Sequence, residues 1–204
     1  MWPADPLDAD MIATALRGGR IGSRVVVLDE TSSTNDVVFA LATEAEEGLV
    51  VFAERQTAGR GQHGKRWESA AGKGLWFSIL VRPQLAPNEL PLLTSWAAQT
   101  TADTLHAELS LGARVKPPND VYVGDRKVAG ILLEMRAVHA AAHVGILGVG
   151  LNVNQTADEF PEELRATAAS LAMLGGQAID RHGLAIALLR ELDRTYTPHP
   201  GPLL

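Results

Sequence analysis

The chain is organised around the sequence Gly59-Arg60-Gly61-Gln62-His63-Gly64-Lys65-Arg66-Trp67. This stretch lies between two apolar runs, residues 49–53 and 75–81, and each run predicts a buried strand. Glycine lets the backbone approach a ligand closely, and successive amide N–H groups in such a loop form an anion-binding nest. The stretch therefore predicts a loop that wraps a phosphorylated or carboxylated ligand. The alternative is a flexible hairpin whose basic residues aid solubility.

Composition narrows the class of protein. The 204 residues suit one domain, and the hydrophobic fraction of 46% with 21% charged residues is typical of a soluble globular protein. A net charge of −6 argues against a general nucleic-acid binder, so the basic loop favours a local anionic ligand over a long polyanion. The chain has no cysteine, which excludes disulfides, thiolate metal sites and a cysteine nucleophile.

Targeting signals are not evident in the sequence. The N-terminus, Met1-Trp2-Pro3-Ala4-Asp5-Pro6, has no basic segment followed by an apolar one, as a secretory signal would. No apolar run reaches the length of a membrane span. Together with the lack of cysteine, these features lead us to expect a cytoplasmic protein without membrane contact.

Hydrophobic periodicity and turn residues predict an α+β protein with one mixed β-sheet and flanking helices. We treat residues 1–204 as a single domain, with a core of about 20–196 and an irregular, proline-rich tail at 197–204. Strands are expected at 24–28, 49–53, 75–81, 113–115, 121–123, 127–135 and 142–148. Helices are expected from Asp8 or Asp10 to about 16, up to about 43, at 89–109, at 158–164 and after Asp180.

Two common nucleotide-binding patterns do not fit the glycine loop. It lacks the third glycine of the dinucleotide fingerprint in register and is not followed by a helix. The Gly-Lys-Ser/Thr ending of a P-loop is missing as well.

Four segments place small or polar residues at the end of an apolar strand. Strand ends converge in a sheet protein, so we expect the four segments to line one pocket. They are Ser33-Thr34-Asn35, Gln56 with the glycine loop, residues 116–120 with 127–131, and residues 148–152.

Taken in this order, these segments resemble the catalytic domain of biotin–protein ligases, over about residues 25–154. The resemblance implies the mixed sheet of the class II aminoacyl-tRNA synthetase and biotin ligase fold. The motifs that carry it are Ser33-Thr34-Asn35, Gln56-Thr57-Ala58-Gly59-Arg60-Gly61, Trp67, Pro118-Asn119-Asp120, Arg126-Lys127-Val128-Ala129-Gly130-Ile131-Leu132 and Gly148-Val149-Gly150-Leu151-Asn152.

The resemblance also implies an activity. Members of the family join biotin to ATP, giving biotinyl-5′-adenylate and pyrophosphate, with Mg²⁺ accompanying the nucleotide. They then transfer biotin to one lysine of a biotin carboxyl carrier protein, in acetyl-CoA carboxylase or a related carboxylase. Because the biotin carboxylate attacks the α-phosphate, two anions must be brought together, which demands cations and backbone donors around both.

By the same resemblance, Lys127 and Arg60 are the catalytic candidates, and Asp120 is a candidate Mg²⁺ ligand. Without the resemblance, each of these residues has an ordinary structural role. Lys127 is then a solvated lysine at a hairpin, and Asp120 is a turn residue. Trp67 or Trp76 is then part of the hydrophobic core. The expected biotin contacts are Ser33, Thr34, Asn35, Gln56, Gly59, Arg60, Gly61, Trp67, Lys127 and Gly130. The expected nucleotide contacts are Gly61, Gln62, His63, Gly64, Trp67, Lys116, Asn119 and Asn152.

The sequence departs from the family pattern at two positions. Gln62 stands where the family often has an arginine that helps to hold the adenylate, which leads to the hypothesis that biotinyl-adenylate leaks from the site. Labelling of bystander lysines no greater than that of a Gln62→Arg variant would refute it. Pro117 replaces the usual tryptophan, so we expect an altered pocket wall and weaker biotin affinity.

The ends of the chain differ as well. Too few residues precede Val25 for the winged-helix domain of repressor-type members, so DNA binding is not expected. The chain stops at Leu204, so the SH3-like domain found after the last helix in many members is expected to be absent. Relatives are monomers or homodimers.

Two alternatives to an active, minimal biotin–protein ligase stay open. Gln62, Pro117 and the missing C-terminal domain favour a biotin-binding pseudoenzyme or half-enzyme, whereas Lys127, Arg60 and Asn152 disfavour it. A lipoate or octanoate ligase-like enzyme has a related fold, but the glycine loop resembles the biotin branch more closely.

Overall fold

A seven-stranded mixed β-sheet forms the centre of the computed structural model, which describes residues 6–139 and 142–197. The strand order is β1-β2-β3-β7-β6-β5-β4; β1 and β2 are parallel, and every other neighbouring pair is antiparallel. This confirms the predicted mixed sheet. The strands are β1 Arg24–Thr31, β2 Leu49–Gln56, β3 Gly74–Val81, β4 Ala113–Lys116, β5 Asp120–Val123, β6 Arg126–His139 and β7 Ala142–Asn152.

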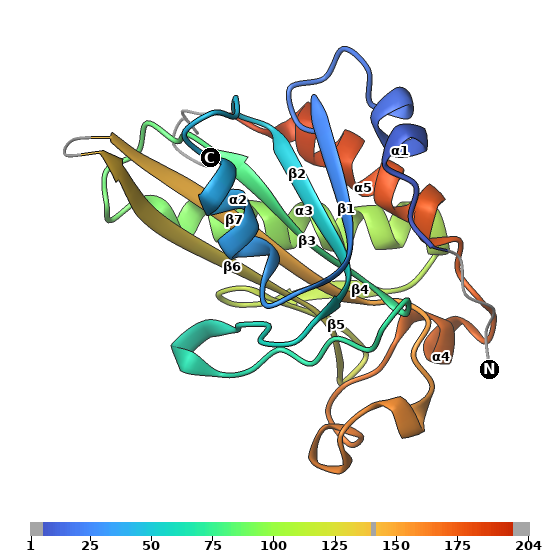
Figure 1. The fold of residues 1–204 in the computed structure, drawn as a ribbon. Helices are drawn as coiled ribbons and strands as arrows, with labels where there is room; N and C mark the ends of the chain where they lie inside the picture. Colours follow the sequence, from blue (N-terminus) through green and yellow to red (C-terminus); the bar gives the residue numbers. More distant parts are fainter. Residues whose placement is uncertain (1–5, 140–141, 198–204) are drawn as a thin grey trace.

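Helices cover both faces of the sheet, as Figure 1 shows. The helices α1 (Ala9–Ala15), α3 (Leu90–Leu109) and α5 (Arg181–Thr195) pack on one face and bury the larger hydrophobic cluster. The shorter helix α2 (Thr34–Leu41) lies on the opposite face over a smaller cluster. Because α2 is only eight residues long, part of that face is left for other segments of the chain.

Local sequence explains the main elements. Every residue of β3 is buried, as expected for a central strand covered on both faces. In α5, Leu184, Leu188 and Leu192 recur at helical spacing and are almost fully buried, contributing about 1.5–3 kcal/mol each. The side chain of Asp180 accepts a hydrogen bond from the His182 amide, which caps this helix as the sequence predicts.

Several predicted boundaries change in the structure. Strands β1, β2, β6 and β7 are longer than predicted because their polar ends still pair with neighbouring strands. The predicted helix at 158–164 is wrong: Pro161 interrupts it, leaving two 3₁₀ turns, η2 (Ala157–Glu159) and η3 (Glu162–Leu164). A five-residue helix, α4 (Leu171–Gly175), was not predicted. Within the expected tail 197–204, residues 198–204 lie outside the described residues.

Contacts between distant parts of the chain hold the two ends of the sequence against the sheet. The fully buried Arg181 donates to Glu54 at 2.8 and 3.2 Å and to the Gly74 carbonyl at 3.1 Å. The Asp193 carboxylate accepts from the backbone amides of Arg20 and Ile21. Helix α5 is therefore fixed both to β2 and to the segment that leads into β1. No helix in the described part of the chain is long and apolar enough to cross a membrane.

Candidate active site

The four polar segments meet in one cavity on the face of the sheet that carries α2. The cavity measures about 50 Å³. Its floor is formed by residues in the middle of β6 and β7, not only by strand ends as predicted, because both strands continue past their glycines. The lining includes Ser33, Thr34, Asn35, Gln56, Arg60, Gly61, Gln62, Trp67, Asn119, Lys127, Gly130, Gly148 and Gly150.

Three glycines in this floor make room for two side chains. A Cβ atom at Gly150 would lie 2.4 Å from the Trp67 ring, and one at Gly130 would lie 2.9 Å from the same ring. A Cβ atom at Gly148 would lie 2.6 Å from Asn35 Oδ1. The absence of side chains here therefore lets the Trp67 indole and the Asn35 amide lie directly on the sheet.

Hydroxyl and amide groups form a connected chain at the start of α2. The Thr34 amide donates to Gln56 Oε1 at 2.9 Å, and its hydroxyl lies 2.6 Å from Ser78 Oγ. Ser78 in turn donates to Asn35 Oδ1. Sequence analysis missed Ser78, although a lone hydroxyl residue in the apolar run of β3 is a signal for such a role. Because these groups bond one another, the polar wall of the cavity is built before any ligand arrives.

Two buried donors in this wall lack a hydrogen bond of normal geometry to the described residues. They are Asn35 Nδ2 and Trp67 Nε1. A buried donor left unsatisfied costs about 1–3 kcal/mol. The cavity therefore favours a small ligand that presents acceptors to these two groups.

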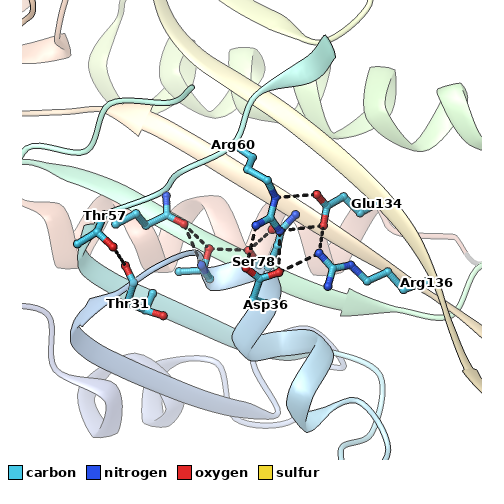
Figure 2. Close-up of polar contacts among 10 residues, drawn as sticks. Thr31, Asp36, Thr57, Arg60, Ser78, Glu134 and Arg136 are labelled. Carbon is cyan, nitrogen blue, oxygen red and sulfur yellow. Dashed lines mark hydrogen bonds and ion pairs between the residues drawn. The ribbon is translucent and has the colours of Figure 1, made fainter. Parts of the chain in front are cut away.

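Arg60 lies at the centre of a network of four charges (Figure 2). Its guanidinium binds Asp36 through two hydrogen bonds of 2.8 and 2.9 Å and Glu134 through two of 3.0 and 3.1 Å. Arg136 also binds Asp36, at 2.9 Å, and Glu134, at 2.8 Å. Two positive and two negative groups balance, so the charge of Arg60 is neutralised within the protein. The network joins the glycine loop to α2 and β6.

The network shifts the pKa of both carboxylates. Hydrogen bonding from Arg60 lowers the pKa of Asp36. Burial raises this pKa in part, and hydrogen bonding from Arg136 lowers it further. Burial raises the pKa of Glu134, but hydrogen bonds from Arg60, Asn35 and Arg136 together bring it below its ordinary value. Both carboxylates are therefore ionised at neutral pH.

Lys127 lines the cavity, and both its side chain and its backbone are fixed by neighbouring residues. Its Nζ lies 2.6 Å from Asp120 Oδ1 and 5.4 Å from the centre of the Trp67 ring. Its backbone accepts from Ala169 at 3.0 Å and donates to Thr167 at 2.8 Å. With only 29% of its side chain exposed, Lys127 is not the freely solvated hairpin lysine of the alternative reading.

A larger cavity of about 420 Å³ adjoins the first. Both are lined by Gly61, Gln62, Trp67, Asn119 and Lys127, so these residues form the junction. Sequence analysis missed the hydrophobic part of this lining, which comes from β5 and the segment after β7. The further lining residues include His63, Glu68, Pro118, Asp120, Tyr122, Asn152, Phe160, Leu164 and Thr167.

Three expected contact residues line neither cavity, and neither does Pro117, which was expected to alter the pocket wall. Lys116 lies over the Tyr122 ring, with its Nζ 5.0 Å from the ring centre. Gly59 supports Trp67, because the Trp67 amide donates to the Gly59 carbonyl at 2.9 Å. Gly64 is the third residue outside both linings.

Trp76, the second tryptophan considered for the wall, is fully buried core. It packs edge-on against Trp67, with 6.2 Å between ring centres. It therefore supports the wall from behind.

The carboxylates of the larger cavity are too few to hold a metal by themselves. No group of three or more His, Cys, Asp or Glu side chains able to bind a metal occurs in residues 6–139 and 142–197. Asp120 and Glu68 line this cavity. Mg²⁺ commonly takes one or two carboxylates and completes its shell with water and substrate phosphates. The donor set therefore fits an ion that arrives with a phosphorylated ligand.

Comparison with known proteins shows which family has a similar sequence. Residues 27–152 match the biotin/lipoate A/B protein ligase family. The bifunctional ligase/repressor BirA of Bacillus spizizenii is 36% identical over 191 residues, 93% of this chain and 59% of that protein. The biotin–[acetyl-CoA-carboxylase] ligase of Mycobacterium tuberculosis is 39% identical over 195 residues, 92% of this chain and 70% of that protein.

Among solved structures, the biotin protein ligase from Aquifex aeolicus in complex with biotin and ATP has a TM-score of 0.72 at 32% identity, covering 83% of this chain and 68% of that one. The similarity confirms the expected biotin ligase-like fold. The chain spans 59% of the length of the Bacillus relative.

Proposed function

Because the chain belongs to the biotin/lipoate A/B protein ligase family, we propose that it joins biotin to ATP and transfers the biotin to a lysine of a carrier protein. The observation that carries the proposal is the pair of adjoining cavities with Lys127 at their junction. The reaction needs two ligands whose reacting anions meet, and this junction is where their occupants would meet.

The small cavity, at about 50 Å³, suits the ureido end of biotin. The buried donors Asn35 Nδ2 and Trp67 Nε1 would face an acceptor such as the ureido carbonyl, and the Trp67 ring offers an apolar wall to the thiophane ring. The remaining proposed contacts are Ser33, Thr34, Gln56, Arg60, Gly61, Lys127 and Gly130, with Gly59 acting through its support of Trp67.

The larger cavity suits ATP. Its volume is about eight times that of the small cavity, and Tyr122, Phe160 and Leu164 provide hydrophobic surface for a base. We propose polar nucleotide contacts from Gly61, Gln62, His63, Asn119 and Asn152, with Lys116 and Gly64 at the rim. Mg²⁺ bound with ATP would offset phosphate charge, and Asp120 is its proposed protein ligand.

In the first step the biotin carboxylate attacks the α-phosphate, a mixed anhydride forms, and pyrophosphate leaves. Lys127 would neutralise charge on both anions, exchanging its contact with Asp120 for substrate oxygens. Arg60 would act chiefly by fixing the glycine loop over the biotin site, because its charge is already balanced. In the second step the carrier lysine attacks the anhydride and AMP leaves.

The proposed acceptor is the biotin carboxyl carrier protein of acetyl-CoA carboxylase, as the name of the Mycobacterium relative indicates for that protein. A cytoplasmic location, lack of DNA binding and a monomeric or homodimeric state stay predictions.

Biotin-dependent exchange of pyrophosphate with ATP tests the first step, and biotin transfer to a carrier domain tests the second. We expect Lys127→Met to lower the exchange rate at least 100-fold, because one charge-stabilising group is lost at the reacting centre. Arg24→Met removes an exposed cation at the far edge of the sheet and serves as the matched control. Absence of exchange by the unaltered chain would refute the ligase proposal, whereas exchange without transfer would indicate a half-enzyme.

A further inference from the structure

A small cluster of buried amides lies behind the wall of the larger cavity. Gln155 is 2% exposed, and its Nε2 donates to Asn152 Oδ1 at 2.9 Å. The backbone carbonyl of Gln155 accepts from Ser170 Oγ at 2.7 Å, and Ser170 is fully buried. The backbone of Gln155 is therefore held in place independently of the side chain's bond to Asn152.

This bond decides which end of the Asn152 amide faces the cavity. A side-chain amide has one acceptor end and one donor end. With Oδ1 engaged by Gln155, the donor end of the amide, Nδ2, is left to face the cavity. Asn152 lines the larger cavity, whereas Gln155 does not. The wall consequently offers an N–H donor, the group that a phosphate or hydroxyl oxygen accepts from.

We propose that Gln155 is a positioning residue for nucleotide binding, which sets the Asn152 amide so that Nδ2 donates to an oxygen of the bound nucleotide. The inference rests on the proposed function, since it assigns ATP to the larger cavity. It adds a residue that touches neither substrate and lies outside the family motifs in the sequence.

A role in stability alone does not explain Gln155. Its Oε1 is buried and has no hydrogen-bond partner within the described residues. A buried acceptor without a partner disfavours the folded state, so an apolar side chain of similar shape is expected to be tolerated there. Gln155→Met keeps the length of the side chain but removes the donor that orients Asn152.

The test is a double-mutant cycle on ATP affinity, measured by titration calorimetry with MgATP on the full chain. We expect Gln155→Met to weaken ATP binding about 3- to 10-fold, the effect of one misdirected hydrogen bond. Biotin affinity should stay within about twofold, and the melting temperature should not fall. Asn152→Ala should weaken ATP binding at least as much, and adding Gln155→Met to it should have no further effect.

The outcomes separate this inference from the proposed function. Failure of the unaltered chain to bind ATP overturns both. ATP binding that is unchanged in Gln155→Met, or additive losses in the double variant, overturn the inference alone. Should Gln155→Met not fold, Asn152→Asp keeps an acceptor for Gln155 but presents an oxygen to the cavity. Undiminished ATP affinity of that variant would overturn the inference, and a loss would support it.

Discussion

Replacing Asp36 by asparagine tests the charge network that anchors the glycine loop. The substitution keeps one oxygen as an acceptor but removes the charge that binds Arg60 in bidentate fashion and also contacts Arg136. Hydrogen bonds to charged groups contribute about 1.5–3 kcal/mol when buried, and exposed ion pairs about 0.2–1 kcal/mol. The Asp36 and Arg60 side chains are 40% and 34% exposed, between these limits. We therefore expect a loss of about 1–2 kcal/mol.

For a chain of this length the loss corresponds to a fall in melting temperature of about 2–8 °C at pH 7. The pH dependence has a defined sign. Folding lowers the pKa of Asp36, chiefly through Arg60, so its contribution is fully present above the unfolded pKa of about 3.9. That contribution is lost as the pH falls through the folded pKa, so the difference between the two proteins should shrink below about pH 4.

Thermal unfolding followed by circular dichroism at pH 7 and near pH 3 measures both effects. Asp10→Asn, at an exposed position in α1, is the matched control and should change the melting temperature little. Equal stability of Asp36→Asn and the unaltered chain at pH 7 would refute the reasoning. A difference that widens in acid would refute it as well.

Two further substitutions test the floor of the small cavity and the buried ion pair. Gly150→Ala places a Cβ atom 2.4 Å from the Trp67 ring, so biotin affinity measured by calorimetry should fall at least 10-fold. Gly112→Ala is the control and should leave biotin affinity unchanged, because a Cβ atom there meets nothing within 4 Å. Glu54→Gln removes the charge of a carboxylate that bonds the fully buried Arg181 at 2.8 and 3.2 Å, so the free energy of unfolding in urea should fall by about 3–5 kcal/mol. A loss below about 1 kcal/mol would show that this ion pair does not stabilise the fold.

The elements that sequence predicts best are those with strong local signals. The apolar run of β3 is confirmed to within one residue, and the periodic helix capped by Asp180 is confirmed as α5. The strand β6 is longer than predicted because Arg136 breaks its apolar pattern but still pairs with β7. A strand is defined by its partner, and the sequence of one strand does not show that partner.

The same limit applies to the candidate site. The motifs that bear glycine and polar residues correctly predicted one shared pocket. The anions around Arg60 were not predicted, because Asp36 and Glu134 lie 24 and 74 positions away in the chain. Phe160 and Leu164 were missed because they carry no motif, and only folding brings their segment to the cavity.

The contacts made by Arg181 and Asp193 also bear on how the chain folds during synthesis. Glu54 is separated from Arg181 by 127 positions, and Asp193 from Arg20 and Ile21 by 173 and 172. Contacts of such long sequence separation form late, because a large loop must close first. On a ribosome, β2 with its Gln56 is made 127 positions before the residue that pairs with Glu54, so Glu54 meets its partner only after Arg181 has emerged. The ligand pocket would thus mature well after the synthesis of β2.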